Sequence, residues 1–243
     1  MNGNAPSSLP PFYVRPRALQ PAEHGGLSLK PDGTYRFAAR SHSVPLVGSE
    51  FFLAQRDFPI VFTNEEVPLP MAVLGLKTGE SLFVDEKGGW RNGAYVPAYI
   101  RRYPFIFAQS PDTTQLTLCI DEAAEIVETS DRRPLFQNGQ PTEFMQKAME
   151  FCVSYQRDHQ ATQQFAEALQ KAGLLVLRDA RVRVSPQETI TLQGFRMVDE
   201  ARFSELPAET FLDWRKRGWI ALVYAHLLSL TAWDRLALLA SAR

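Results

Sequence analysis

The stretch MAVLGLKTGESLFVDEKGGWRNGAYVPAYIRRYPFIF, residues 71–107, decides the fold of this 243-residue chain. Short apolar runs alternate in it with turn signals, a pattern typical of strand-rich structure. Residues 71–76 predict a buried strand, and residues 81–85 predict a second strand after a turn at 77–80. Another turn is predicted at residues 86–89, because paired glycines adopt positive φ at little cost.

The neighbouring segments continue this pattern. Apolar runs at residues 59–63, 104–107 and 116–120 predict three more strands. Between them, Pro97 predicts the first turn of a short helix that carries residues 99–102. The first half of the chain is therefore predicted to be strand-rich and mostly antiparallel.

The second half changes to a helical period. Apolar side chains recur at helical spacing over residues 144–155, and a second helix is predicted from a Thr162 N-cap to a stop at Gly173. Asn138-Gly139 is a turn signal, and a turn at residues 185–188 is predicted to join two alternating segments into a β-hairpin.

Three helices are predicted toward the end of the chain. Pro207 begins the first, which Gly218 ends, and apolar positions from Ile220 to Leu228 mark the second. A capping-box-like pattern at Thr231 predicts the start of the third.

These elements predict an α+β fold with a simple division along the chain. A strand-rich segment, residues 35–137, should pack with a mainly helical segment, residues 138–243, as a single domain over residues 35–243. Residues 1–34 are rich in Pro, Gly and Ser, so we expect an extended or disordered lead-in there.

The composition excludes several functional classes. Lys and Arg number 26 against 27 Asp and Glu, so the chain lacks the positive field that drives nucleic-acid binding. The longest apolar stretch, residues 219–230, is too short to span a bilayer. The N-terminus lacks the apolar core of a signal peptide, which predicts a cytoplasmic location. Cys119 and Cys152 lie in apolar surroundings and are predicted to be buried free thiols.

No catalytic or metal-binding motif is present in the sequence. The four histidines, His24, His42, His159 and His226, have none of the spacings of a zinc or iron site. The segment at residues 75–79 lacks the Gly-Lys-Ser/Thr order of a phosphate loop, and Gly-x-Gly-x-x-Gly and Gly-x-Ser-x-Gly are absent. We therefore predict no catalytic residues, no metal and no cofactor.

The candidate binding residues are aromatic side chains interleaved with arginines. Arginine offers a planar fork for carboxylates and stacks on aromatic rings, while Tyr and Trp give large contact areas. The candidates for a ligand or partner site are Trp90, Tyr95, Tyr99, Arg101, Arg102 and Tyr103. Secondary candidates are Trp214 and Trp219. The structural alternative is that these residues fix a loop to the sheet and complement a helix end.

The central block resembles the SapC family of bacterial proteins. The matching motifs are Ser-Leu-Phe-Val-Asp at residues 81–85, Gly-Gly-Trp at 88–90, Tyr-Val-Pro at 95–97 and Arg-Arg-Tyr-Pro-Phe at 101–105. The resemblance extends over nearly the whole chain from about residue 36. It implies an association with surface-layer protein export and supplies no catalytic residues.

The sequence thus favours a non-catalytic accessory protein that binds a peptide or a surface-protein cargo. One alternative is an enzyme, or the partner of a modifying enzyme, whose active site forms from residues remote in sequence. Another is a structural protein that acts as a homo-oligomer.

Overall fold

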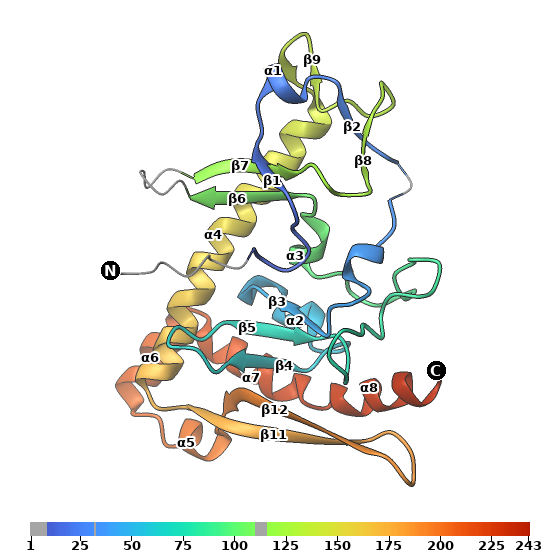
Figure 1. Cartoon of the computed structure of the whole chain (residues 1–243). Helices are drawn as coiled ribbons and strands as arrows, with labels where there is room; N and C mark the ends of the chain where they lie inside the picture. Colours follow the sequence, from blue (N-terminus) through green and yellow to red (C-terminus); the bar gives the residue numbers. More distant parts are fainter. Residues whose placement is uncertain (1–8, 32, 110–115) are drawn as a thin grey trace, which may run out of the picture. The chain divides into compact units, whose positions relative to one another are not determined.

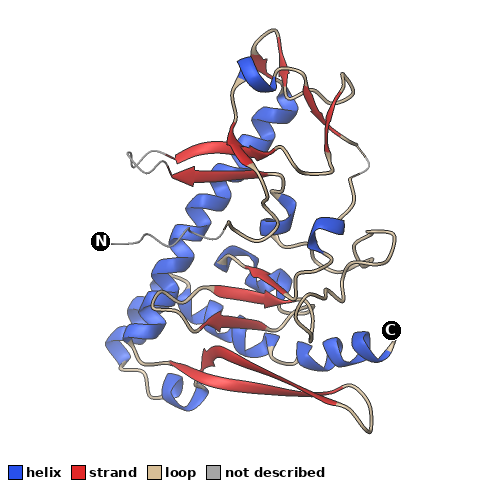
Figure 2. Ribbon diagram, viewed as in Figure 1, coloured by secondary structure: helices blue, strands red, loops and turns tan. Residues whose placement is uncertain are grey.

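The computed structural model describes residues 9–31, 33–109 and 116–243 (Figure 1). It confirms the α+β class: antiparallel sheets dominate the first half of the chain, and helices dominate the second (Figure 2). The chain divides into two compact units that are each discontinuous in sequence. Unit 1 is Met1–Ala38 with Arg102–Ser154, and unit 2 is Ala39–Arg101 with Tyr155–Arg243.

Unit 1 is built on short antiparallel strands. Its elements are β1 (Pro16–Ala18), α1 (Pro21–His24), β2 (Leu27–Leu29), η1 (Arg36–Ala38), β6 (Phe105–Gln109), β7 (Leu116–Asp121), β8 (Val127–Thr129), β9 (Phe136–Gln137), β10 (Gln140–Pro141) and the start of α4 (Glu143–Lys171). The strands pair as β1-β7-β6, β2-β8 and β10-β9. Buried side chains from these strands and α4, including Phe105, Ile120 and Met145, form its core.

The N-terminal region corrects the prediction of an extended or disordered lead-in at residues 1–34, as far as the structure describes it. Strands β1 and β2 pair with β7 and β8, and Tyr13 is buried. The buried carboxylate of Asp121 accepts the Val14 N–H at 3.0 Å, although the two residues are 107 positions apart. These backbone partners are distant in sequence, so the local Pro and Gly content gave no sign of them.

Unit 2 is built on a five-stranded antiparallel sheet of order β11-β12-β4-β5-β3. Its strands are β3 (Ser43–Pro45), β4 (Ile60–Thr63), β5 (Pro70–Val73), β11 (Leu175–Arg183) and β12 (Thr189–Val198). Its helices are η2 (Gly48–Glu50), α2 (Phe51–Ala54), α3 (Ala98–Arg101), the end of α4, α5 (Glu200–Ser204), α6 (Ala208–Lys216), α7 (Trp219–Ser229) and α8 (Ala232–Ser241). Helix α7 contacts β4 and β12, and α8 contacts β11.

A buried histidine ties α7 to the sheet. His226 Nε2 accepts the Val198 N–H at 3.1 Å, and Nδ1 lies 2.9 Å from the Ile60 carbonyl oxygen. Ser229 Oγ accepts the Ile60 N–H at 2.9 Å and donates to the His226 carbonyl oxygen. Burial lowers the pKa of His226 to about 4, so the ring is neutral at pH 7.

Several local predictions are confirmed. Asn138 and Gly139 both have positive φ between β9 and β10, as a tight hairpin turn requires. The hairpin of β11 and β12 forms around residues 185–188, with strands longer than predicted. Gly173 and Gly218 end α4 and α6 with positive φ. Both cysteines are buried and free.

Other local predictions are wrong. One continuous helix, α4, replaces the two predicted, because Thr162 Oγ1 donates to the Asp158 carbonyl oxygen within the helix and does not cap it. Residues 81–85 form no strand beyond a single Val84–Trp90 bridge. The Thr231 hydroxyl donates back to the Leu228 carbonyl oxygen, so α8 begins without the predicted side-chain cap.

The backbone of residues 81–85 donates its hydrogen bonds to several separate segments and not to a single neighbouring strand. The Ser81 N–H donates to the Ala39 carbonyl oxygen, the Leu82 N–H to that of Leu74, and the Phe83 N–H to Ser81 Oγ. The segment is therefore a fixed loop. Among the described residues, no helix has the length and hydropathy needed to cross a membrane.

Candidate functional site

The fixed loop and the residues that follow it, up to Asn92, form most of the wall of a surface hollow of about 830 Å³ in unit 2. Its lining residues are Ala39, Ser81, Leu82, Phe83, Val84, Asp85, Glu86, Trp90, Arg91, Asn92, Ala242 and Arg243. This volume falls in the range of ligand-binding clefts. Because its wall includes the predicted binding residue Trp90, the hollow is the candidate site.

Trp90 is a half-buried aromatic side chain in this wall. Its ring stacks on Phe83 with centroids 5.8 Å apart and an interplanar angle of 24°. Its Nε1–H donates to the Tyr95 carbonyl oxygen at 3.1 Å. A stacking contact and a hydrogen bond thus help to fix the indole while it lines the hollow.

The charges around the hollow differ in how they are satisfied. The Arg243 guanidinium lies 2.9 Å from Glu80 and donates to the carbonyl oxygens of Ser81 and Val84 at 2.8 and 2.9 Å. Arg91 is exposed, and within the described part of the chain its guanidinium contacts no carboxylate. Since the exposed Asp85 and Glu86 also line the hollow, it offers both signs of charge.

Glu50 fixes the segment that leads from Trp90 into α3. Its buried carboxylate accepts the Ala98 N–H at 2.6 Å and the Tyr95 hydroxyl at 2.9 Å, and Arg101 Nη2 lies 4.0 Å away. Burial raises the pKa of Glu50, although these contacts oppose the shift. Burial and the neighbouring Glu50 carboxylate raise the pKa of Tyr95 to about 12.

Asp57 anchors the same segment at its start. The buried carboxylate accepts the Tyr95 N–H at 2.8 Å, and Arg235 Nη2 lies 3.0 Å from it. Sequence reasoning missed both Glu50 and Asp57, because the partners that they hold in this segment lie 38 to 48 positions later in the chain. No local motif marks either residue.

The six predicted site residues are divided between the two units. Trp90, Tyr95, Tyr99 and Arg101 belong to unit 2, whereas Arg102 and Tyr103 belong to unit 1. Of the six, Trp90 lines the large hollow. Tyr99 is buried, with its ring 6.5 Å from that of Tyr155.

Arg101 is bound within its own loop. Its Nε–H donates to the Val96 carbonyl oxygen at 3.0 Å, and Nη2 donates to the Tyr95 hydroxyl at 3.2 Å. Its guanidinium also lies over the Tyr95 ring, 5.8 Å from the centroid. Most of the arginine–tyrosine pattern in unit 2 therefore serves to hold the loop.

In unit 1, Arg102 is buried, with its guanidinium 5.9 Å from the centroid of the Tyr13 ring. The Tyr103 hydroxyl donates to Asp121 at 3.3 Å, and its ring stacks on Phe37 at 4.1 Å. Burial and the Asp121 carboxylate raise the pKa of Tyr103. Tyr103 lines a second hollow of about 440 Å³.

The secondary candidates lie in a helical corner of unit 2. Trp214 is buried, and its ring meets that of Trp219 edge to face at 5.8 Å. The Arg217 guanidinium covers the Trp219 ring at 4.9 Å. These contacts favour the structural interpretation of the two tryptophans.

Within residues 9–31, 33–109 and 116–243, no three His, Cys, Asp or Glu side chains come close enough together to hold a metal ion. That no metal binds stays a prediction.

Together, the fold and the hollow define an α+β protein with an aromatic-walled surface cavity. The SapC family model matches residues 19–236, so this chain belongs to the SapC family, as its sequence resemblance predicted. Neither the curated proteins nor the solved structures contain a match to it.

Proposed function

We propose that this chain is a non-catalytic accessory protein that binds a peptide segment of a protein cargo in the Trp90 hollow. One observation carries the proposal: the Trp90 indole is fixed by Phe83 and by the Tyr95 carbonyl while it forms part of the cavity wall. A pre-organised aromatic side chain loses little freedom on binding, which makes it an effective anchor.

The charges of the hollow support a peptide as the ligand. The Arg91 guanidinium can donate two hydrogen bonds to a carboxylate, and Asp85 or Glu86 can accept hydrogen bonds from a backbone amide or a basic side chain. A polypeptide carries all of these groups together with apolar side chains for Trp90. The family's association with surface-layer export makes a surface protein the proposed cargo. The cytoplasm, expected from the N-terminal sequence, stays the proposed compartment.

The experiment begins with an array of random peptides of about 12 residues, a length that exceeds the span of a cavity of this size. Purified protein is applied to the array, and fluorescence polarisation gives the affinity of the peptides that bind. Trp90→Ala should weaken binding about tenfold or more, whereas Trp90→Phe should retain most of it. Arg91→Ala should reduce affinity several-fold for peptides that carry a carboxylate.

The matched control is Arg215→Ala, because Arg215 is an exposed arginine of α6 that does not line the hollow. It should bind like the wild type. Trp90→Phe and Arg91→Ala keep the test valid even if Trp90→Ala unfolds the loop. The proposal fails if no peptide binds, or if folded Trp90 and Arg91 variants bind every peptide as tightly as the wild type.

A further inference from the structure

The hairpin of β11 and β12 projects beyond the sheet of unit 2. Strand β12 pairs with β4 only at Phe195–Thr63 and Arg196–Phe62, whereas its pairing with β11 continues to Thr189. Residues 179–193 therefore form a two-stranded ribbon whose outer strand, β11, is the last strand of the sheet (Figure 1). We call this segment the ribbon.

The backbone of the ribbon has an open side. The Val184 N–H donates to the Glu188 carbonyl oxygen, and Val182 and Ala180 follow at alternate positions opposite Ile190 and Leu192. Because hydrogen-bonded pairs alternate along an antiparallel ladder, the N–H and C=O of Arg181 and Arg183 point away from β12. Among the described residues, no other element donates to these groups or accepts from them.

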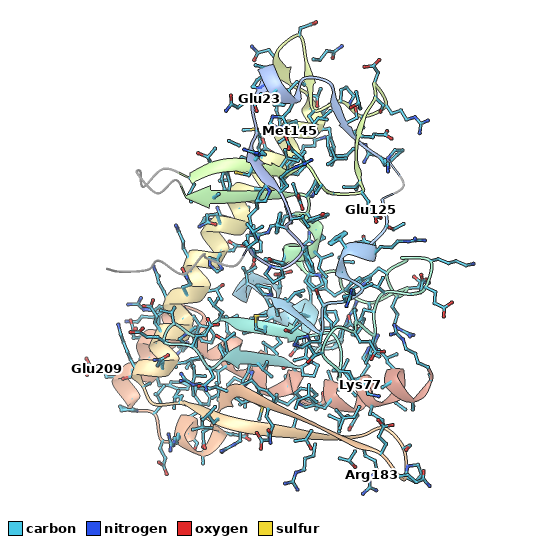
Figure 3. The ribbon with its side chains drawn as sticks, viewed as in Figure 1. Glu23, Lys77, Glu125, Met145, Arg183 and Glu209 are labelled. Atoms are coloured by element: carbon cyan, nitrogen blue, oxygen red, sulfur yellow. The ribbon has the colours of Figure 1, made fainter. Side chains whose placement is uncertain are left out.

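The same two residues place their side chains on the exposed face of the ribbon. Val182 is buried on the opposite face, whereas Arg181 and Arg183 are exposed. Across the pair they face Thr191 and Thr189, which are also exposed. Open backbone and exposed arginine side chains thus coincide at alternate positions of one strand, and Figure 3 labels Arg183 beside the turn of the hairpin.

The acidic side chains of the ribbon already have partners. Glu188 lies 3.3 Å from Lys77, and Asp179 accepts from Gln193 at 3.3 Å. At the root of the hairpin, Asp199 lies 3.0 Å from Arg178. In the described part of the chain, neither Arg181 nor Arg183 contacts a carboxylate.

We propose that the β11 edge binds an extended acidic segment of a partner protein by strand addition. The added strand would donate to and accept from the backbone of Arg181 and Arg183, and its carboxylates at alternate positions would lie opposite the two guanidinium groups. This surface is distinct from the Trp90 hollow, and the inference does not depend on the proposed function.

Charge argues against a second copy of this chain as the occupant. An antiparallel pair of β11 strands centred on Val182 would place Arg181 of one copy opposite Arg183 of the other, and like charges directly opposite are destabilising. Charged edge strands commonly prevent self-association in this way. The same two arginines therefore disfavour an identical strand and favour an acidic one.

The test uses defined peptides and the full-length protein. The probe is a fluorescein-labelled peptide of alternating Glu and Val, and the two comparison peptides are a block-ordered peptide of the same composition and an alternating Lys-Val peptide. The double variant Arg181→Glu with Arg183→Glu should weaken binding of the alternating Glu probe about tenfold. The control, Arg215→Glu with Lys216→Glu on α6, reverses two exposed charges elsewhere and should bind normally.

A second variant tests the backbone contact separately. Arg183→Pro removes an outward N–H that β12 does not use, and proline is tolerated on edge strands. Arg183→Pro should abolish binding of the Glu-Val probe. N-methylation of the probe at alternate residues should do the same, and this test leaves the protein unchanged. Far-ultraviolet circular dichroism would verify that the Arg183→Pro protein is folded.

Three outcomes would overturn the proposal. The first is equal binding of the block-ordered or Lys-Val peptide, because the alternation of carboxylates would then be irrelevant. The second is normal binding of N-methylated probes, which would leave only non-directional charge attraction. The third is a dimer of the unliganded chain that Arg183→Pro dissociates, because a second copy would then be the occupant of the edge.

Discussion

The ribbon at residues 179–193 and the loop region, which comprises residues 81–101 and includes α3, both present arginines, but they use them differently. In the loop region, Arg101 bonds to the Val96 carbonyl and the Tyr95 hydroxyl, and it lies near the buried Glu50. In the ribbon, Arg181 and Arg183 have no carboxylate partner within the described residues. The aromatic–arginine pattern, which is dense in the sequence, mostly stabilises the loop region. The two ribbon arginines form a simpler pattern, and their charges are available to a partner.

The largest effect that tests this difference is expected at Asp57. Asp57→Ala should lower the free energy of unfolding by about 3 kcal/mol, because the Tyr95 N–H and Arg235 both lose a buried carboxylate. Asp57→Asn should recover part of this loss, since its amide oxygen can still accept the Tyr95 N–H. The matched ribbon variant, Asp179→Ala, should cost less than about 0.5 kcal/mol.

Urea unfolding followed by fluorescence would measure all three variants. A loss at Asp179 equal to that at Asp57 would mean that the ribbon depends on its charges as much as the loop does. The contrast between the two regions would then be wrong.

The second effect concerns pH and the root of the ribbon. The pKa of His226 falls from 6.5 to about 4 on folding because the ring is buried, so the unfolded chain binds a proton that the folded chain does not. This contribution to stability is complete above pH 6.5 and is lost as the pH falls toward 4. The loss should reach about 2 kcal/mol at about pH 5.

Glu50 acts in the opposite direction. Its pKa is raised by burial, so its contribution to stability is present at low pH and is lost as the pH rises. Glu50→Gln should therefore steepen the loss of stability on acidification, and His226→Ala should flatten it. Urea unfolding at a series of pH values would separate the two, and identical slopes in all three proteins would contradict the assignment.

A third, smaller loss of stability is expected at Gly194, where the ribbon joins the sheet. Gly194 has a φ of 83°, at the point where the pairing of β11 with β12 shifts register. A Cβ there would meet no atom within 4 Å, so Gly194→Ala should cost only the backbone term, about 1 kcal/mol. Gly75→Ala should cost more, because its Cβ would overlap the Glu80 carbonyl oxygen.

Thermal unfolding of the two glycine variants would check this order. If Gly194→Ala proves the more harmful change, the backbone at Gly194 is held by more than its φ angle. The ribbon would then be less independent of the sheet than its pairing indicates.

The features that could be predicted from sequence have short-range causes. Asn138-Gly139, Gly173 and Gly218 act through their own φ angles, so the turn and the two helix ends followed directly from the residues. The alternation on either side of residues 185–188 is equally local, and it indicated the hairpin.

The features that could not be predicted depend on distant partners. The strands β1 and β2 acquire their order from β7 and β8, about a hundred positions later. Threonine commonly caps helices, which is the basis of the predicted N-cap at Thr162. In the structure its hydroxyl donates within α4 instead, and it accepts from the Gly48 N–H, 114 residues away. Glu50 and Asp57 could not be predicted for the same reason. The sequence therefore predicted a cluster of binding residues, but not that buried carboxylates fix the segment that carries them.

The smallest expected change in stability compares the ribbon arginines, Arg181 and Arg183, directly with Arg101. Replacing Arg181 and Arg183 together with Ala should change the free energy of unfolding by less than about 0.5 kcal/mol, because exposed side chains without partners contribute little. Arg101→Ala should cost about 1 kcal/mol, since it removes hydrogen bonds to Val96 and Tyr95. Paired urea titrations would resolve this difference. If the ribbon double variant is the less stable protein, its arginines are structural, and a partner strand is no longer needed to explain why they are there.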